Sequence, residues 1–181
     1  VGALTGPTGA GVYRIAEQFA ALINKSVQKL LVPAIYPDLA RQTTRDQHKL
    51  RAATVLRTGA IAGSLAACLF ALLSVAGKPL ITMIFGPAYT EQAYPVMLGL
   101  ALAGVIQALS FAMAPLFSAA GAITRLVSVR AGAMICYGIA MPLLVQTAGL
   151  AGAGLAMIVY QCILLIMLLK LGYTLLRSNR E

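Results

Sequence analysis

A stripe of charged and amide side chains lies within a segment long enough to cross a lipid bilayer. The segment covers residues 11–37 and is otherwise mostly apolar. On a helix that turns by about 100° per residue, the polar side chains fall together between about −80° and +60° when Arg14 is set to zero. The candidate cavity-lining residues on this face are Arg14, Gln18, Asn24, Lys25, Gln28 and Lys29.

Cations in this setting indicate a path for an anion. Ionisable groups at membrane depth are costly, so they face a bundle interior or a wet cavity. Arginine offers a planar fork of donors and lysine a mobile point charge for phosphate or carboxylate. Glu17 lies one turn from Arg14, so we expect it to offset that charge or to couple an ion or proton. Lys25 is then the deepest unpaired cation, because Lys29 is near enough to the helix end to snorkel.

The composition is that of an integral membrane protein. Of 181 residues, 60% are hydrophobic and 10% are charged, whereas soluble domains carry about 25% charged residues. The net charge of +9 resides mainly between apolar runs, there is no Trp, and no aromatic residues interleave with the basic ones. This distribution argues against nucleic-acid binding.

No catalytic or metal-binding pattern is present in the sequence. Cys68, Cys136 and Cys162 lie apart inside apolar runs, and their spacing fits neither a zinc site nor a disulfide framework. His48, the single histidine, stands in a basic loop without partners for acid–base chemistry. We therefore expect no enzyme activity, no metal and no cofactor.

The apolar runs predict an all-α, polytopic transmembrane helix bundle that forms a single domain. Basic connections alternate with poorly charged ones, which places the chain entry outside and the C-terminus in the cytoplasm. Residues 11–37 could instead form a helix that lies in the membrane interface, and this alternative stays open. The uncharged segment before Gly11 and the basic segment after Pro37 favour a helix that crosses the membrane. The predicted spans are residues 11–37, 58–77, 94–120, 126–146 and 150–169.

Two glycine motifs predict local structure. Gly59 and Gly63 have the small-xxx-small spacing that lets helices approach closely, and we interpret them as packing residues. The Gly86-Pro87 pair predicts a turn at the outer surface.

Several short motifs occur in an order that resembles the polysaccharide flippases of the MOP superfamily. They are the run GVYRIA at 11–16, PAIYP at 33–37, IFGPAY at 84–89, AAG at 119–121 and GLAGA at 149–153. The resemblance covers essentially the whole chain. It implies a fold with two lobes of six helices, in which this chain supplies the eighth to twelfth helices and residues 1–10 the exit of the seventh.

The resemblance implies transport of an undecaprenyl-diphosphate-linked oligosaccharide across a bacterial inner membrane by alternating access. The cationic stripe suits the diphosphate and acidic sugars, and Gln18, Asn24 and Gln28 suit sugar hydroxyls. Because the sequence opens on Val1 without a signal-peptide pattern, we expect a fragment that lacks its N-terminal lobe. The expected partners are membrane lipid, the lipid-linked anionic glycan, the N-terminal lobe and the glycan-polymerase machinery.

Three other functions stay open at this point. A multidrug or toxin exporter of the same superfamily would need membrane-embedded acids, and Glu17 is the single acid at membrane depth beside three cations. A membrane enzyme of glycan assembly would need paired carboxylates or a nucleophile with its base, and the sequence shows neither pattern. A purely structural fragment is the third alternative.

Overall fold

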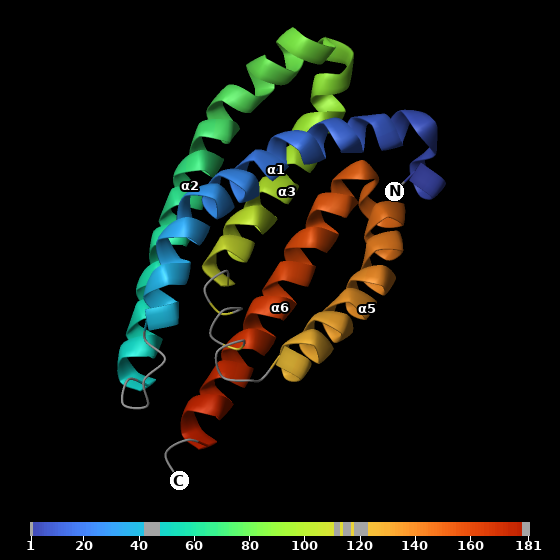
Figure 1. Cartoon of the computed structure of the whole chain (residues 1–181). Helices are drawn as coiled ribbons and strands as arrows, with labels where there is room; N and C mark the ends of the chain where they lie inside the picture. Colours follow the sequence, from blue (N-terminus) through green and yellow to red (C-terminus); the bar gives the residue numbers. More distant parts are fainter. Residues whose placement is uncertain (1, 42–47, 111–112, 114–116, 118–122, 179–181) are drawn as a thin grey trace.

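The computed structural model of the chain describes residues 2–41, 48–110, 113, 117 and 123–178, and all of its regular structure in these residues is helical. Side chains are described for residues 6–23, 25–27, 29, 57–110, 113, 117 and 123–172. The helices are α1 (Gly2–Arg41), α2 (His48–Phe85), α3 (Pro87–Ser110), α5 (Ile123–Ala148) and α6 (Leu150–Ser178). The prediction of an all-α bundle is confirmed for this part of the chain (Figure 1).

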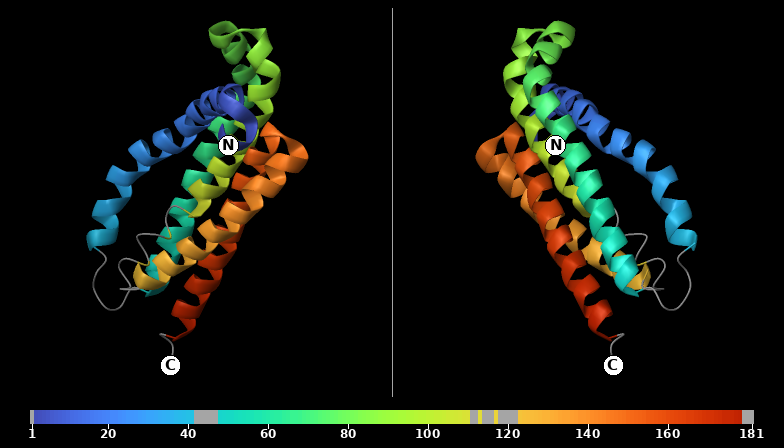
Figure 2. Two further views of the ribbon diagram at one scale, coloured as in Figure 1. Left: turned by 90° about the vertical axis from the view of Figure 1, so that its right-hand side faces the viewer. Right: turned by 90° about the vertical axis from the view of Figure 1, so that its left-hand side faces the viewer.

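Successive helices run in opposite directions, and α3 occupies the middle of the bundle. It packs against α1, α2 and α6, while α5 pairs with α6 (Figure 1). Gly6, with a φ of 73°, interrupts the helical path near the start of α1. Towards its C-terminal end α1 diverges from the other helices, as both side views show (Figure 2).

Within the described residues, four helices are long and apolar enough to cross a membrane, which supports a multi-pass membrane protein. They are Arg57–Phe85, Pro87–Ser110, Ile123–Ala148 and Leu150–Gly172. The predicted spans 58–77, 126–146 and 150–169 lie inside α2, α5 and α6, and α2 continues through Pro79 to Phe85. The predicted span 94–120 begins in α3 and extends into residues outside the described part. Helix α1 contains the predicted span 11–37 but is not one of the four, so its crossing stays a prediction.

Small residues allow the helices to approach closely. A Cβ atom added to Gly99 of α3 would lie 3.0 Å from the Cα of Gly154 in α6. A Cβ atom added to Gly59 of α2 would lie 3.0 Å from the carbonyl oxygen of Leu109 in α3. Gly63 also faces Leu109, which confirms the packing role predicted for the Gly59–Gly63 pair.

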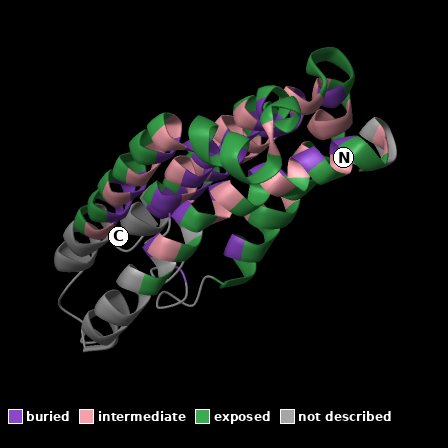
Figure 3. Ribbon diagram, turned by 90° about the horizontal axis from the view of Figure 1, so that it is seen from above, coloured by how far each residue is buried: buried purple, intermediate pink, exposed green. Residues whose placement is uncertain are grey.

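Buried residues gather between the helices, and large apolar side chains cover much of the outer surface (Figure 3). In water such a large apolar surface would promote aggregation, whereas in a bilayer it is the expected lipid-facing side. Exposed members include Leu72, Val75 and Met83 of α2 and Ile135 and Ile139 of α5.

Two glycines in the left-handed region form the tight turns. Gly86 (φ 87°) separates α2 from α3, and its N–H donates to the Thr82 carbonyl at 3.0 Å. Gly149 (φ 61°) separates α5 from α6. Residues with a Cβ atom rarely adopt this conformation, so glycine suits both positions. The predicted turn at Gly86-Pro87 is confirmed.

Tyr94 connects α3 to α2 by a hydrogen bond from its hydroxyl to the Ser74 carbonyl at 2.7 Å. We expect Tyr94→Phe to lower the free energy of unfolding by about 0.5–1 kcal/mol, because a half-buried bond of this kind contributes about that much. The measurement is the thermal unfolding midpoint in mild detergent. Tyr89→Phe is the matched control, because the exposed Tyr89 of the same helix forms no hydrogen bond with the described residues. Equal midpoints for the two variants would contradict the prediction.

Candidate translocation surface

Helix α1 has one packed face and one exposed face. The packed residues recur every three or four positions, which is the spacing of one side of a helix. They are Val12, Ala16, Ala20, Ile23 and Val27, each at most 5% exposed. These residues join a core cluster formed mainly with α2 and α3. Because Ala16 and Ala20 have short side chains, α1 can lie close to α3.

The predicted polar stripe lies on the opposite, exposed face. Arg14, Gln18, Lys25 and Lys29 are all exposed, as is Glu17. The side chains of Asn24 and Gln28 lie outside the described residues. Leu22 is 54% exposed, so this apolar residue also lies on the open face. We call Arg14, Glu17, Gln18, Lys25 and Lys29 the polar stripe from here on.

The stripe cations have no acidic partner among the described residues. Arg14 forms no ion pair with Glu17, so the expected neutralisation is not observed in the described part of the chain. Glu17 is itself exposed on this face. Arg14 and Lys25 are therefore both available to an anion.

Exposure of these cations constrains what covers α1. A lipid-facing arginine or lysine at membrane depth costs at least about 2.5 kcal/mol, so such residues face water, protein or each other. The described helices leave the stripe open. In a membrane, the stripe must therefore face a water-filled space or another protein segment, unless α1 lies in the interface.

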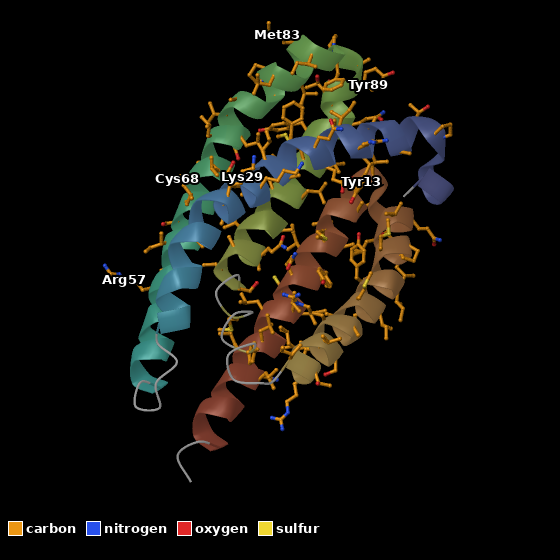
Figure 4. The ribbon with its side chains drawn as sticks, in the orientation of Figure 1. Tyr13, Lys29, Arg57, Cys68, Met83 and Tyr89 are labelled. Atoms are coloured by element: carbon orange, nitrogen blue, oxygen red, sulfur yellow. The ribbon has the colours of Figure 1, made fainter. Side chains whose placement is uncertain are left out.

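Three tyrosines lie close together where α1 passes α5 and α6, and sequence reasoning gave them no role. The rings of Tyr137 and Tyr160 pack edge to face with centroids 5.6 Å apart. The hydroxyl of Tyr13 interacts with that of Tyr137, and Tyr13 lies where α1 passes α6 (Figure 4). The sequence carries no signal for this cluster, because its members are far apart along the chain and only the tertiary fold brings them together.

Arg130 of α5 is a further charged residue to which sequence reasoning gave no role. It is exposed on α5 and lies seven residues before Tyr137, so the two share a helix face. A periodicity test of residues 126–146 would have found this relation, since 130 and 137 are two turns apart.

The described residues hold no group of three or more His, Cys, Asp or Glu side chains placed to bind a metal ion. Cys68 and Cys136 are exposed on the apolar surface and Cys162 is half-buried, all as free thiols. The chemistry available to the polar stripe is therefore charge pairing and hydrogen bonding.

Comparison with known protein families finds a match to the family described as "Polysaccharide biosynthesis protein". The match covers residues 1–94, which is just over half of the chain and includes α1, α2 and the start of α3. It thus contains the whole polar stripe. No curated protein and no solved structure matches the chain.

Proposed function

The chain belongs to the polysaccharide biosynthesis protein family, and from this premise we propose that it is a flippase for a lipid-linked glycan. The cargo is an undecaprenyl-diphosphate-linked oligosaccharide, moved outward across a bacterial inner membrane. The polar stripe of α1 lines the path, and an N-terminal lobe like that of MOP-superfamily flippases forms the opposite wall. In this proposal the chain catalyses no reaction.

One observation carries the proposal: the cationic stripe is open, while the apolar face of the same helix is packed. The stripe offers three cations and one carboxylate, which favours a diphosphate or an acidic sugar over a cationic drug. Gln18 adds a neutral donor and acceptor for sugar hydroxyls. A moderate number of contacts suits a carrier, because the cargo must also be released.

The distribution of charge along the bundle supports the proposed orientation. Arg57 near the start of α2 lies at the end of the bundle where α1 ends (Figure 4), and Arg125 near the start of α5 and Lys170 towards the end of α6 belong to segments at this same end (Figure 1). The segments at the other end, where α2 gives way to α3, carry Lys78 and Glu91. Basic residues concentrate on the cytoplasmic side of membrane proteins. We therefore propose that the C-terminus is cytoplasmic.

Thiol labelling tests whether the stripe faces water. In a chain with Cys68, Cys136 and Cys162 changed to alanine, we expect Gln18→Cys and Lys25→Cys to react with a charged methanethiosulfonate reagent. Leu72→Cys, on the apolar surface of α2, is the control and should react at least tenfold more slowly, since a thiolate does not form in lipid. Equal rates at Gln18→Cys and Leu72→Cys would contradict a wet path along α1.

The same reagent separates a crossing helix from one that lies in the interface. Gly11→Cys and Arg41→Cys stand near opposite ends of α1. Applied to sealed vesicles of each orientation, the reagent should reach these two positions from opposite sides. Labelling of both from one side would show an interfacial helix and overturn the proposed path.

A further inference from the structure

A pocket with both polar and apolar lining opens at the end of the bundle opposite the C-terminus, and none of its lining residues belongs to the polar stripe. Three helices form it, each near its N-terminal end. Its volume is about 460 Å³, within the range of small-ligand pockets, about 300–1,000 Å³. The residues that matter for its chemistry are Thr8 of α1, Glu91, Gln92 and Pro95 of α3, and Leu150 and Ala151 of α6.

The polar side chains of this pocket are free to meet a ligand. Thr8, Glu91 and Gln92 are all exposed, and none of them has a hydrogen-bond partner among the described residues. Together they present a hydroxyl, a carboxylate and an amide, which supply both donors and acceptors. Leu150 and Ala151 begin α6, where helix N–H groups lack intrahelical partners.

The charge of the lining disfavours an anionic ligand, because Glu91 repels an anion and no cation among the lining residues offsets it. A neutral molecule with many hydroxyl groups avoids this repulsion, and its hydroxyls can donate to the Glu91 carboxylate and form hydrogen bonds with Thr8 and Gln92. Pro95 and Leu150 give an apolar wall for the C–H face of a sugar ring.

We propose that this pocket is a subsite for neutral sugars of the transported glycan, on the outer side of the membrane. The inference rests on the proposed flippase function for its place in transport, but the pocket itself can bind a saccharide whether or not the protein transports one. The two sites then bind chemically different parts of the same glycan. The polar stripe takes the anionic groups, and the outer pocket takes uncharged sugar rings.

Saturation-transfer NMR on the full chain in lipid nanodiscs tests the pocket directly. The probes are methyl glycosides of neutral hexoses and N-acetylhexosamines. We expect saturation transfer to at least one probe, reduced at least fivefold by the Glu91→Ala/Gln92→Ala double variant and also reduced by Thr8→Val. These residues are exposed, so the substitutions leave the buried core unchanged.

Gln146→Ala is the matched control, because Gln146 is an exposed glutamine near the same end of the bundle that does not line the pocket. It should leave the saturation transfer unchanged. Absence of transfer to every probe, or equal transfer in wild type and the Glu91/Gln92 double variant, would overturn the subsite.

Failure of the sugar subsite can be distinguished from failure of the proposed flippase function. If substitution of Arg14 and Lys25 blocks glycan export but no probe binds, the flippase function is supported and the subsite is rejected. If the probes bind through Glu91 and Gln92 while the stripe proves inaccessible to water, the saccharide site is supported and the proposed path along α1 is rejected.

Discussion

The Arg14→Ala/Lys25→Ala double variant is expected to export glycan at least tenfold more slowly than the wild type while still inserting into the membrane. Both cations are exposed on α1 and have no acidic partner in the described structure. Charge-assisted hydrogen bonds contribute about 1.5–3 kcal/mol each, and about 1.4 kcal/mol is a factor of ten. The measurement is restoration of surface glycan in an export-deficient strain by the complete protein.

Matched controls separate a local effect from a loss of total charge. Lys78→Ala and Arg125→Ala remove the same two side-chain types at exposed positions away from the stripe. Both variants should restore export. Full restoration by the Arg14→Ala/Lys25→Ala variant, at equal protein level, would exclude these residues from the path.

The structure changes the expected ranking of the single variants. Sequence reasoning placed Lys25 first, because Glu17 was expected to offset Arg14. Glu17 forms no ion pair with Arg14 in the described part of the chain. We therefore expect Arg14→Ala and Lys25→Ala to reduce export by similar factors, and Lys29→Ala by less because Lys29 can snorkel.

Replacing Gly99 with leucine is expected to destabilise the bundle more than the loss of the Tyr94 hydroxyl does. Even a methyl group at this position would lie 3.0 Å from the Cα of Gly154, and a backbone atom cannot rotate away as a side chain can. Overpacking of this kind costs about 1–3 kcal/mol, and separation of α3 from α6 would expose further buried residues on both helices.

The measurement is the temperature at which half of the protein aggregates from mild detergent. Gly99→Ala should lower it and Gly99→Leu should lower it further. Gly138→Ala is the control, because a Cβ atom on Gly138 of α5 has no neighbour within 4 Å. If Gly99→Ala and Gly138→Ala gave the same temperature, the close contact between α3 and α6 would not contribute to stability.

The sequence predicted the helices and the faces of α1 because both depend on local patterns. Charge-free apolar runs indicate helices in a membrane protein, and 3.6-residue periodicity places Arg14, Gln18 and Lys25 opposite Val12 and Ala16. These predictions need no knowledge of which helices are neighbours.

Contacts between helices could not be predicted in the same way. The pair Gly99–Gly154 and the ring pair Tyr137–Tyr160 join residues far apart in the sequence. Periodicity shows that a residue lies on a face, but it does not show which helix that face meets. The outer pocket was missed for the same reason, since its lining comes from α1, α3 and α6.

The contact between Gly99 and Gly154 also limits how α3 and α6 can move in the proposed transport cycle. Sliding α3 by one helical turn, about 5.4 Å, would bring Pro95 or Ala103 to the position of Gly99, where a Cβ atom would lie 3.0 Å from the Cα of Gly154. The contact therefore opposes shear of this size between the two helices. Since α3 also packs against α1 and α2, we expect the proposed change of access at the polar stripe to move α3 and α6 together and not past each other.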